Sequence, residues 1–287
     1  MILEKLTKRY PQLYLVPGDN MLEEYRKVVL EGKIPEKLSL ELFHGTSLDD
    51  IFTEETPAGT VEIVYLYDRQ DFDNFLRIMC YRCSTVDIPP AIGAMTLSGV
   101  INRDKIRRHK EKYILSGGDN WASEWKLFSA DKKNYTDTLI VISNGAYSNI
   151  PYDRAGYSEE EWMRISRIIR TYHECTHVIC QRLYPELKET IWDEVVADAI
   201  GILFALNEYD VKLAEMFLGV SADGYVGGRL ENYLSEKEKT NIDEIAVRTD
   251  RLIHQIRNER DKKKEEPYFK FLEYLEAHRC CFEQILI

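Results

Sequence analysis

The sequence predicts an α+β fold in which a small mixed sheet is followed by a mostly helical C-terminal half. Segments rich in β-branched and aromatic residues cluster before residue 146. The chain after Tyr157 shows helical periodicity nearly throughout. Strands followed by a run of helices are typical of α+β proteins. With 287 residues, the chain is long enough to bury a sizeable core.

Residues 1–58 are expected to form an N-terminal, mainly helical segment packed on the rest of the chain, with a helix over 20–31 that ends at Gly32. Residues 59–287 are expected to form the main domain, with the sheet over about 60–146 and the helical part over about 158–287. Whether the first segment is a domain of its own stays open. Expected strands span 61–67, 92–101 and 138–143, and expected helices span 70–83 and 121–128.

Composition and charge exclude several classes of protein. The net charge is −11, which disfavours a broad interface with nucleic acid or an anionic membrane, because phosphate binding needs clustered Lys and Arg. The short basic run over 103–110 is interrupted by an acid and is interpreted as a solvated helix face. No signal peptide or membrane-spanning run is evident. We therefore expect a cytoplasmic protein.

Two helices in the C-terminal half carry the residues of chemical interest. Ser158 followed by Glu161 is a capping-box pattern, so a helix should begin there and continue to about Tyr184, where Pro185 ends it. A second helix is expected from about Glu186 or Thr190 to Asn207.

The first of these helices contains the motif His173-Glu174-Cys175-Thr176-His177. Histidines spaced i, i+4 lie on one face of a helix, one turn apart, and both can ligate one tetrahedral zinc ion. Glu174 follows the first histidine, which is where a general base for metal-activated water must lie. Two ligands and a base do not complete a site, however, so a suitable third ligand decides whether the motif is a metal site.

Glu194 is the expected third ligand. If the two helices form an antiparallel pair, Glu194 lies at the depth of His177, about 10 Å from the turn. Asp198 lies one turn beyond Glu194 and could accept a hydrogen bond from a ligand histidine. Ala197 and Gly201 are small and allow a close approach of the helices. Glu189 and Asp193 are alternative third ligands.

This pattern of HECTH followed by a helical E-x-x-x-D resembles the gluzincin class of zinc metallopeptidases over roughly residues 138–201. The resemblance implies a zincin-like fold, Zn²⁺ bound by His173, His177 and Glu194, Glu174 as general base, and Asp198 orienting a ligand histidine. It implies a peptide or protein substrate. The metzincin pattern does not fit, because it needs glycine and histidine where this chain has Cys180 and Leu183.

Two further parts of such a site can be sought in the sequence. Zincins bind substrate along a sheet edge, and residues 138–146 are placed for that, with an interior strand as the equal alternative. A side chain that stabilises the oxyanion is also needed. Tyr225 is the leading candidate because glycines flank it, and Arg229 and His254 are alternatives.

Other interpretations remain open. A zinc hydrolase of a non-peptide amide would use the same residues. A catalytically silent zincin fold could instead serve as an interaction module. Cys80 and Cys83 have the C-x-x-C spacing of zinc or redox sites, and Cys280, Cys281 and His278 could in principle complete a second site. Reduced, structural thiols are the preferred interpretation.

Overall fold

The computed structural model describes residues 1–187 and 190–286. Contacts divide the chain into two compact units. The first comprises 1–54 and 61–144, and the second comprises 55–60 and 145–287. These units are defined by contacts and do not test the expected domains 1–58 and 59–287, which remain a prediction.

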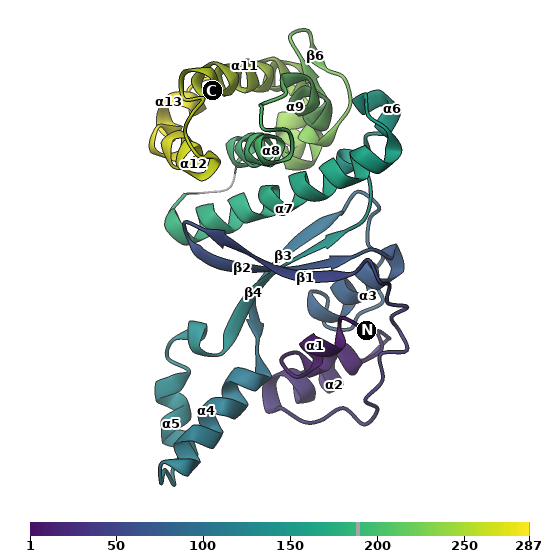
Figure 1. Ribbon diagram of the computed structural model, residues 1–287, viewed down its shortest axis with the longest axis vertical. Coiled ribbons are helices and arrows are strands. Elements are labelled where there is room, and N and C mark those ends of the chain that lie inside the picture. Colours follow the sequence, from purple (N-terminus) through teal and green to yellow (C-terminus); the bar gives the residue numbers. More distant parts are fainter. Residues whose placement is uncertain (188–189, 287) are drawn as a thin grey trace. The chain divides into compact units, whose positions relative to one another are not determined.

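The first unit is built on a four-stranded mixed sheet with the order β1-β2-β4-β3 (Figure 1). Strand β2 pairs with β4 in parallel, and β3 pairs with β4 antiparallel. The three expected strands are confirmed. Strand β1 was not expected, because its sequence DIFTEET alternates irregularly and is rich in acids and threonine. The strands are β1 (Asp50–Thr56), β2 (Gly59–Leu66), β3 (Ala94–Ile101) and β4 (Thr136–Ser143).

Strand β4 is an interior strand, which confirms the second of the two alternatives for residues 138–146 and removes the first, a sheet edge that binds substrate. Ile140 pairs with Ile63 of β2 on one side and with Thr96 of β3 on the other. Both rows of backbone hydrogen-bonding groups are therefore used within the sheet, and an added peptide strand has no edge to join. Its last five residues are buried, as the apolar run TLIVIS requires.

Short helices complete the first unit, and the expected helices over 20–31, 70–83 and 121–128 are confirmed within a few residues. Gly32 ends the helical segment in the left-handed conformation, with φ +74°. Phe72 and Phe75 from α3 are fully buried in the same cluster as Val64 and Leu139 of the sheet. The helical segments are α1 (Glu4–Thr7), η1 (Pro11–Tyr14), α2 (Leu22–Arg26), η2 (Lys27–Glu31), α3 (Arg69–Met79), α4 (Arg103–Leu115), α5 (Trp121–Phe128) and η3 (Lys132–Asn134).

The second unit is mostly helical, as expected. It also contains a hairpin of two short strands, each of two residues: β5 (Val220–Ser221) and β6 (Gly224–Tyr225). Its core gathers large apolar side chains, among them Trp162, Trp192 and Phe217. The helical segments are η4 (Tyr147–Asn149), α6 (Tyr152–Ala155), α7 (Glu159–Leu183), α8 (Ile191–Leu206), α9 (Val211–Leu218), η5 (Arg229–Tyr233), α10 (Glu236–Lys239), α11 (Ile242–Lys262), α12 (Tyr268–Ala277) and α13 (Arg279–Glu283).

Helices α7 and α8 form the pair on which the candidate site is built. Ser158 caps α7 by accepting a hydrogen bond from the N–H of Glu161, as the sequence pattern predicts. Thr190 and Asp193 form a full capping box at the start of α8. A Cβ at Gly201 would lie 2.8 Å from the backbone oxygen of Ile169. The absence of that atom lets the two helices approach closely, as expected. With a mixed sheet in the first unit and mostly helices in the second, the α+β class is confirmed.

Candidate metal centre

His173, His177 and Glu194 come together between α7 and α8, with one ligand atom from each lying within 4.8 Å of the others. The Nε2 atoms of the histidines are 3.1 Å apart. Nε2 of His173 lies 3.6 Å from one carboxylate oxygen of Glu194, and Nε2 of His177 lies 3.5 Å from the other. The three residues predicted as ligands are therefore neighbours in the structure.

These separations fit a zinc ion. Ligands at 2.0–2.1 Å from a tetrahedral zinc lie about 3.3 Å from one another. The three observed separations, 3.1–3.6 Å, bracket that value. Oε2 of Glu194 is buried and has no hydrogen-bond partner. An orphaned buried carboxylate oxygen is costly unless a cation or donor compensates it, so the donor set and its geometry both suit a metal ion.

The cluster contributes three ligand atoms and remains accessible. Across residues 1–187 and 190–286, no cysteine joins this group of potential ligands. The side chains of His177 and Glu194 are 16% and 17% exposed, whereas that of His173 is 8% exposed. Three protein ligands at an accessible position are typical of catalytic rather than structural zinc.

Asp198 orients His173. Nδ1 of His173 donates a hydrogen bond to Oδ1 of Asp198 at 2.9 Å, which leaves Nε2 as the nitrogen that faces the cluster. The Tyr147 hydroxyl also donates to Oδ1, at 2.6 Å, and lies 2.9 Å from Nδ1 of His173. Arg229 forms an ion pair with the other oxygen of Asp198. One buried carboxylate is thus held by three side chains.

The charges of this group explain the pKa shifts within it. Burial would raise the pKa of Asp198, but Arg229 and His173 outweigh it and hold the pKa well below its usual range. Burial would lower the pKa of His173, but Asp198 outweighs it and the pKa is raised. Burial raises the pKa of Tyr147, so its hydroxyl stays protonated and able to donate.

Two residues near the cluster were not identified from the sequence. Tyr147, in η4, supplies a hydrogen bond to Asp198 from 51 residues away. Tyr233, at the end of η5, has a pKa raised by burial and by the Glu194 carboxylate, against the opposing effect of Arg229. Tyrosine is abundant in this chain, at 18 residues, so residue type alone did not single them out. The only sequence feature noted near Tyr147 was the turn at Asn144-Gly145, which directly follows β4.

The other predicted residues are placed as follows. Glu174 is half-buried on α7, directly after His173. The Tyr225 hydroxyl donates to the carbonyl of Gly228 at 2.8 Å and accepts from its N–H, so it braces its own loop. Asp193, an alternative ligand, instead caps α8 and forms an ion pair with Arg279. Glu189, the other alternative, lies outside the described residues.

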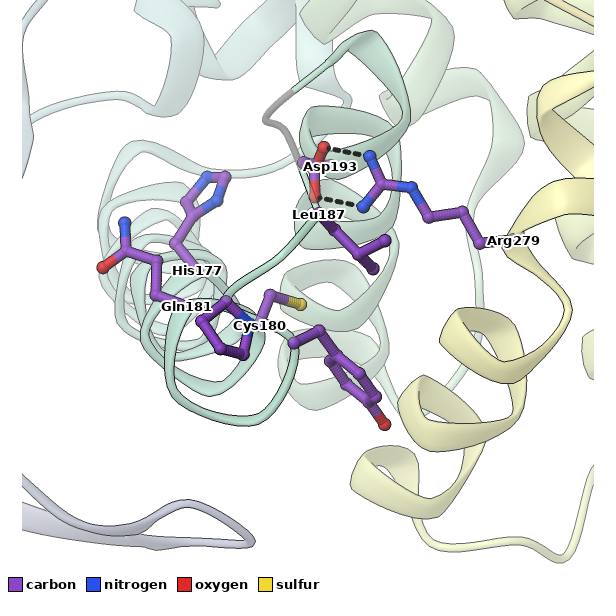
Figure 2. Close-up of a pocket in the computed structure, with 8 residues that line it drawn as sticks. His177, Cys180, Gln181, Leu187, Asp193 and Arg279 are labelled. Carbon is purple, nitrogen blue, oxygen red and sulfur yellow. Dashed lines mark hydrogen bonds and ion pairs between the residues drawn. The ribbon is translucent and has the colours of Figure 1, made fainter.

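A cavity of about 220 Å³ adjoins His177. Its wall includes Cys180, Leu187 and the ion pair between Asp193 and Arg279, in which two guanidinium nitrogens contact the two carboxylate oxygens. Figure 2 shows this ion pair together with His177 and Gln181, which also line the cavity. Because Asp193 already neutralises Arg279, the cavity offers apolar surface and a satisfied ion pair next to the metal-ligand cluster.

All six cysteines lie in the described part of the chain, and none of them forms a disulfide. Burial raises the pKa of both Cys80 and Cys83 to about 12, which keeps these thiols protonated at neutral pH. Protonated thiols are poor metal ligands and poor nucleophiles. This agrees with the preferred interpretation of structural thiols.

No helix in the described part of the chain is both long and apolar enough to cross a membrane.

The fold and the site define an α+β protein whose helical unit holds a His–His–Glu cluster able to ligate a metal ion. The chain belongs to a family of unknown function, DUF7005, whose model matches residues 2–268. No curated protein and no solved structure matches the chain.

Proposed function

We propose that this protein is a zinc-dependent hydrolase, with a zincin-like catalytic unit, that cleaves peptide bonds by means of metal-activated water. The observation that carries the proposal is the meeting of His173, His177 and Glu194 at zinc-ligand separations, with Asp198 bonded to the far nitrogen of His173. A cluster assembled by chance has no reason to include a buried carboxylate that orients a ligand.

The residues have separate roles in this mechanism. His173, His177 and Glu194 would hold the ion. A bound zinc ion would lower the pKa of water and polarise a substrate carbonyl. Glu174 accepts the proton of the attacking water and later passes it to the leaving nitrogen. The Asp198 group keeps His173 in the orientation that the ion requires.

The surroundings supply the remaining functions. The cavity beside His177 has the size and apolar lining to hold a substrate side chain. Tyr225 was the candidate for stabilising the oxyanion, and we keep it as a proposal, although its hydroxyl is bonded to Gly228. Tyr233 and Arg229 are alternative candidates for stabilising the oxyanion. Tyr233 experiences the charge of the Glu194 carboxylate, and Arg229 forms an ion pair with Asp198.

The first experiment is the zinc content of the purified protein, measured by elemental mass analysis. Glu194→Ala should lose one equivalent of zinc relative to wild type, because two histidines alone hold zinc weakly. Glu186→Ala is the matched control, since Glu186 is exposed in the connection between α7 and α8. Equal zinc content in wild type and Glu194→Ala would refute this ligand set.

The second experiment separates binding from catalysis. Glu174→Gln keeps the size of the side chain but removes the base, so it should retain zinc and lose hydrolysis of a peptide library by at least 100-fold. Substantial remaining activity would contradict the mechanism. Cleavage of non-peptide amides but not of peptides would favour the alternative hydrolase, and zinc binding with no turnover at all would favour the silent interaction module.

A further inference from the structure

A second group of metal-ligand side chains lies between α9 and α11. Glu215, Asp250 and His254 each place one ligand atom within 4.8 Å of the others. Asp250 and His254 are spaced i, i+4 on α11, so they share one face of that helix. Glu215 reaches them from α9, and its Oε1 lies 3.2 Å from Nε2 of His254.

Asp250 is the buried member of this group. It is only 6% exposed, and its ligand oxygen, like that of Glu215, lies within 4.8 Å of a ring nitrogen of His254. Burial raises the pKa of Glu215, and the nearby Asp250 carboxylate raises it further, against the opposing effect of His254. Once both ionise, they repel each other at close range in a poorly solvated place.

A cation removes this conflict. It would neutralise the pair and use the imidazole nitrogen that already faces Glu215. One imidazole with two carboxylates is a ligand set that suits Zn²⁺ or Mn²⁺, whereas Ca²⁺ and Mg²⁺ prefer oxygen ligands alone. We propose that Glu215, Asp250 and His254 form a second divalent-metal site, of the zinc or manganese type, that links α9 to α11.

The position of the site indicates what the ion would do. The segment between α9 and α11 contains Arg229, which pairs with Asp198. An ion that ties the two helices together would restrain both ends of this segment. His254 is 57% exposed, so metal can reach the site from solvent. We therefore assign it a structural role, separate from the ligands His173, His177 and Glu194.

A third group in the chain shows what a similar cluster looks like when its carboxylates are already satisfied. His44, Asp68 and Asp71 also lie within 4.8 Å. However, the two oxygens of Asp71 accept hydrogen bonds from the N–H groups of His44 and Gly45 at 2.9 and 2.8 Å. Asp68 caps α3. These carboxylates have donors without a metal ion, so His44 supplies a matched control.

The test measures metal binding in a background that lacks the first site. Chelator-stripped Glu194→Ala is titrated with zinc chloride, and separately with manganese chloride, by calorimetry. We expect one zinc equivalent to bind and to raise the melting temperature. Adding Asp250→Asn or His254→Ala should weaken this binding at least 10-fold and abolish the thermal shift. Adding His44→Ala should leave both unchanged.

Two outcomes would overturn the proposal: no zinc binding by Glu194→Ala, or equal binding after Asp250→Asn and His254→Ala. Asp250→Asn relieves the carboxylate pair and keeps the shape of the side chain, so it should fold at least as well as its parent without metal. Circular dichroism checks this. Because hydrolysis is not measured, the result is independent of the proposed function.

Discussion

Asp198 is the residue on which the candidate metal centre depends most. Its carboxylate is completely buried, and a buried anion is tolerated only when charge and donors surround it. Arg229 supplies the charge, while Tyr147 and His173 supply donors to the same oxygen. Each of these side chains is therefore held in one place, and so is the ring of His173 that faces the cluster.

At this scale we predict the effect of Tyr147→Phe. The change removes one donor to Asp198 while keeping the ring, so the carboxylate orients His173 less well. Zinc affinity should fall about 10-fold, measured by competition with a chromophoric chelator. Tyr225→Phe is the control, because its hydroxyl bonds the backbone of Gly228. Equal affinities in the two variants would show that Tyr147 does not act through Asp198.

At the scale of elements, the approach of α7 to α8 decides whether the ligands meet. His173 and His177 come from one helix and Glu194 from the other. Gly201 packs directly against the backbone of Ile169. A bulkier residue there must push the helices apart, and the separation between the ligands would increase with them.

We predict that Gly201→Ala lowers stability. The added Cβ would lie 2.8 Å from a backbone oxygen, and such overpacking costs about 1–3 kcal/mol. The gain in helix propensity, about 1 kcal/mol, offsets part of this. The midpoint of urea unfolding should fall, and zinc affinity with it. Gly18→Ala is the control, because its Cβ would meet only a flexible methionine side chain at 3.4 Å. A midpoint at or above wild type would contradict this packing argument.

The cysteine-bearing elements should differ in reactivity. Burial raises the pKa of Cys80 and Cys83 at the end of α3, whereas Cys280 and Cys281 in α13 are exposed. Because the thiolate is the reactive form, iodoacetamide at pH 8 should label the α13 pair first, as peptide mass spectrometry would show. Equal labelling of both pairs in the folded protein would contradict the structure, and denatured protein is the control.

At the scale of the whole molecule, the chain consists of two compact units, and the candidate ligands all come from the second. The first unit has its own sheet and its own apolar cluster. A metal ion that links α7 to α8 should therefore stabilise one unit and act little on the core of the other.

Hydrogen exchange tests this division. Removing zinc with a chelator should increase amide exchange in α7 and α8, because the link between them is lost. Exchange in β2 and α3 should stay the same. In Glu194→Ala the chelator should have little effect on α7 and α8. A uniform increase across both units would show that the metal stabilises the chain as a whole.

The sequence by itself determined the long helices, most strands and which three side chains meet between α7 and α8, because these depend largely on local periodicity. Two histidines one turn apart share a helix face whatever surrounds them, and a short antiparallel connection brings Glu194 to the same depth. Tertiary structure alone decided that β4 is interior and that Tyr147 and Arg229 meet at Asp198. Strand order and these contacts, 51 and 31 residues apart in sequence, follow from the packing of distant segments, which no local pattern encodes.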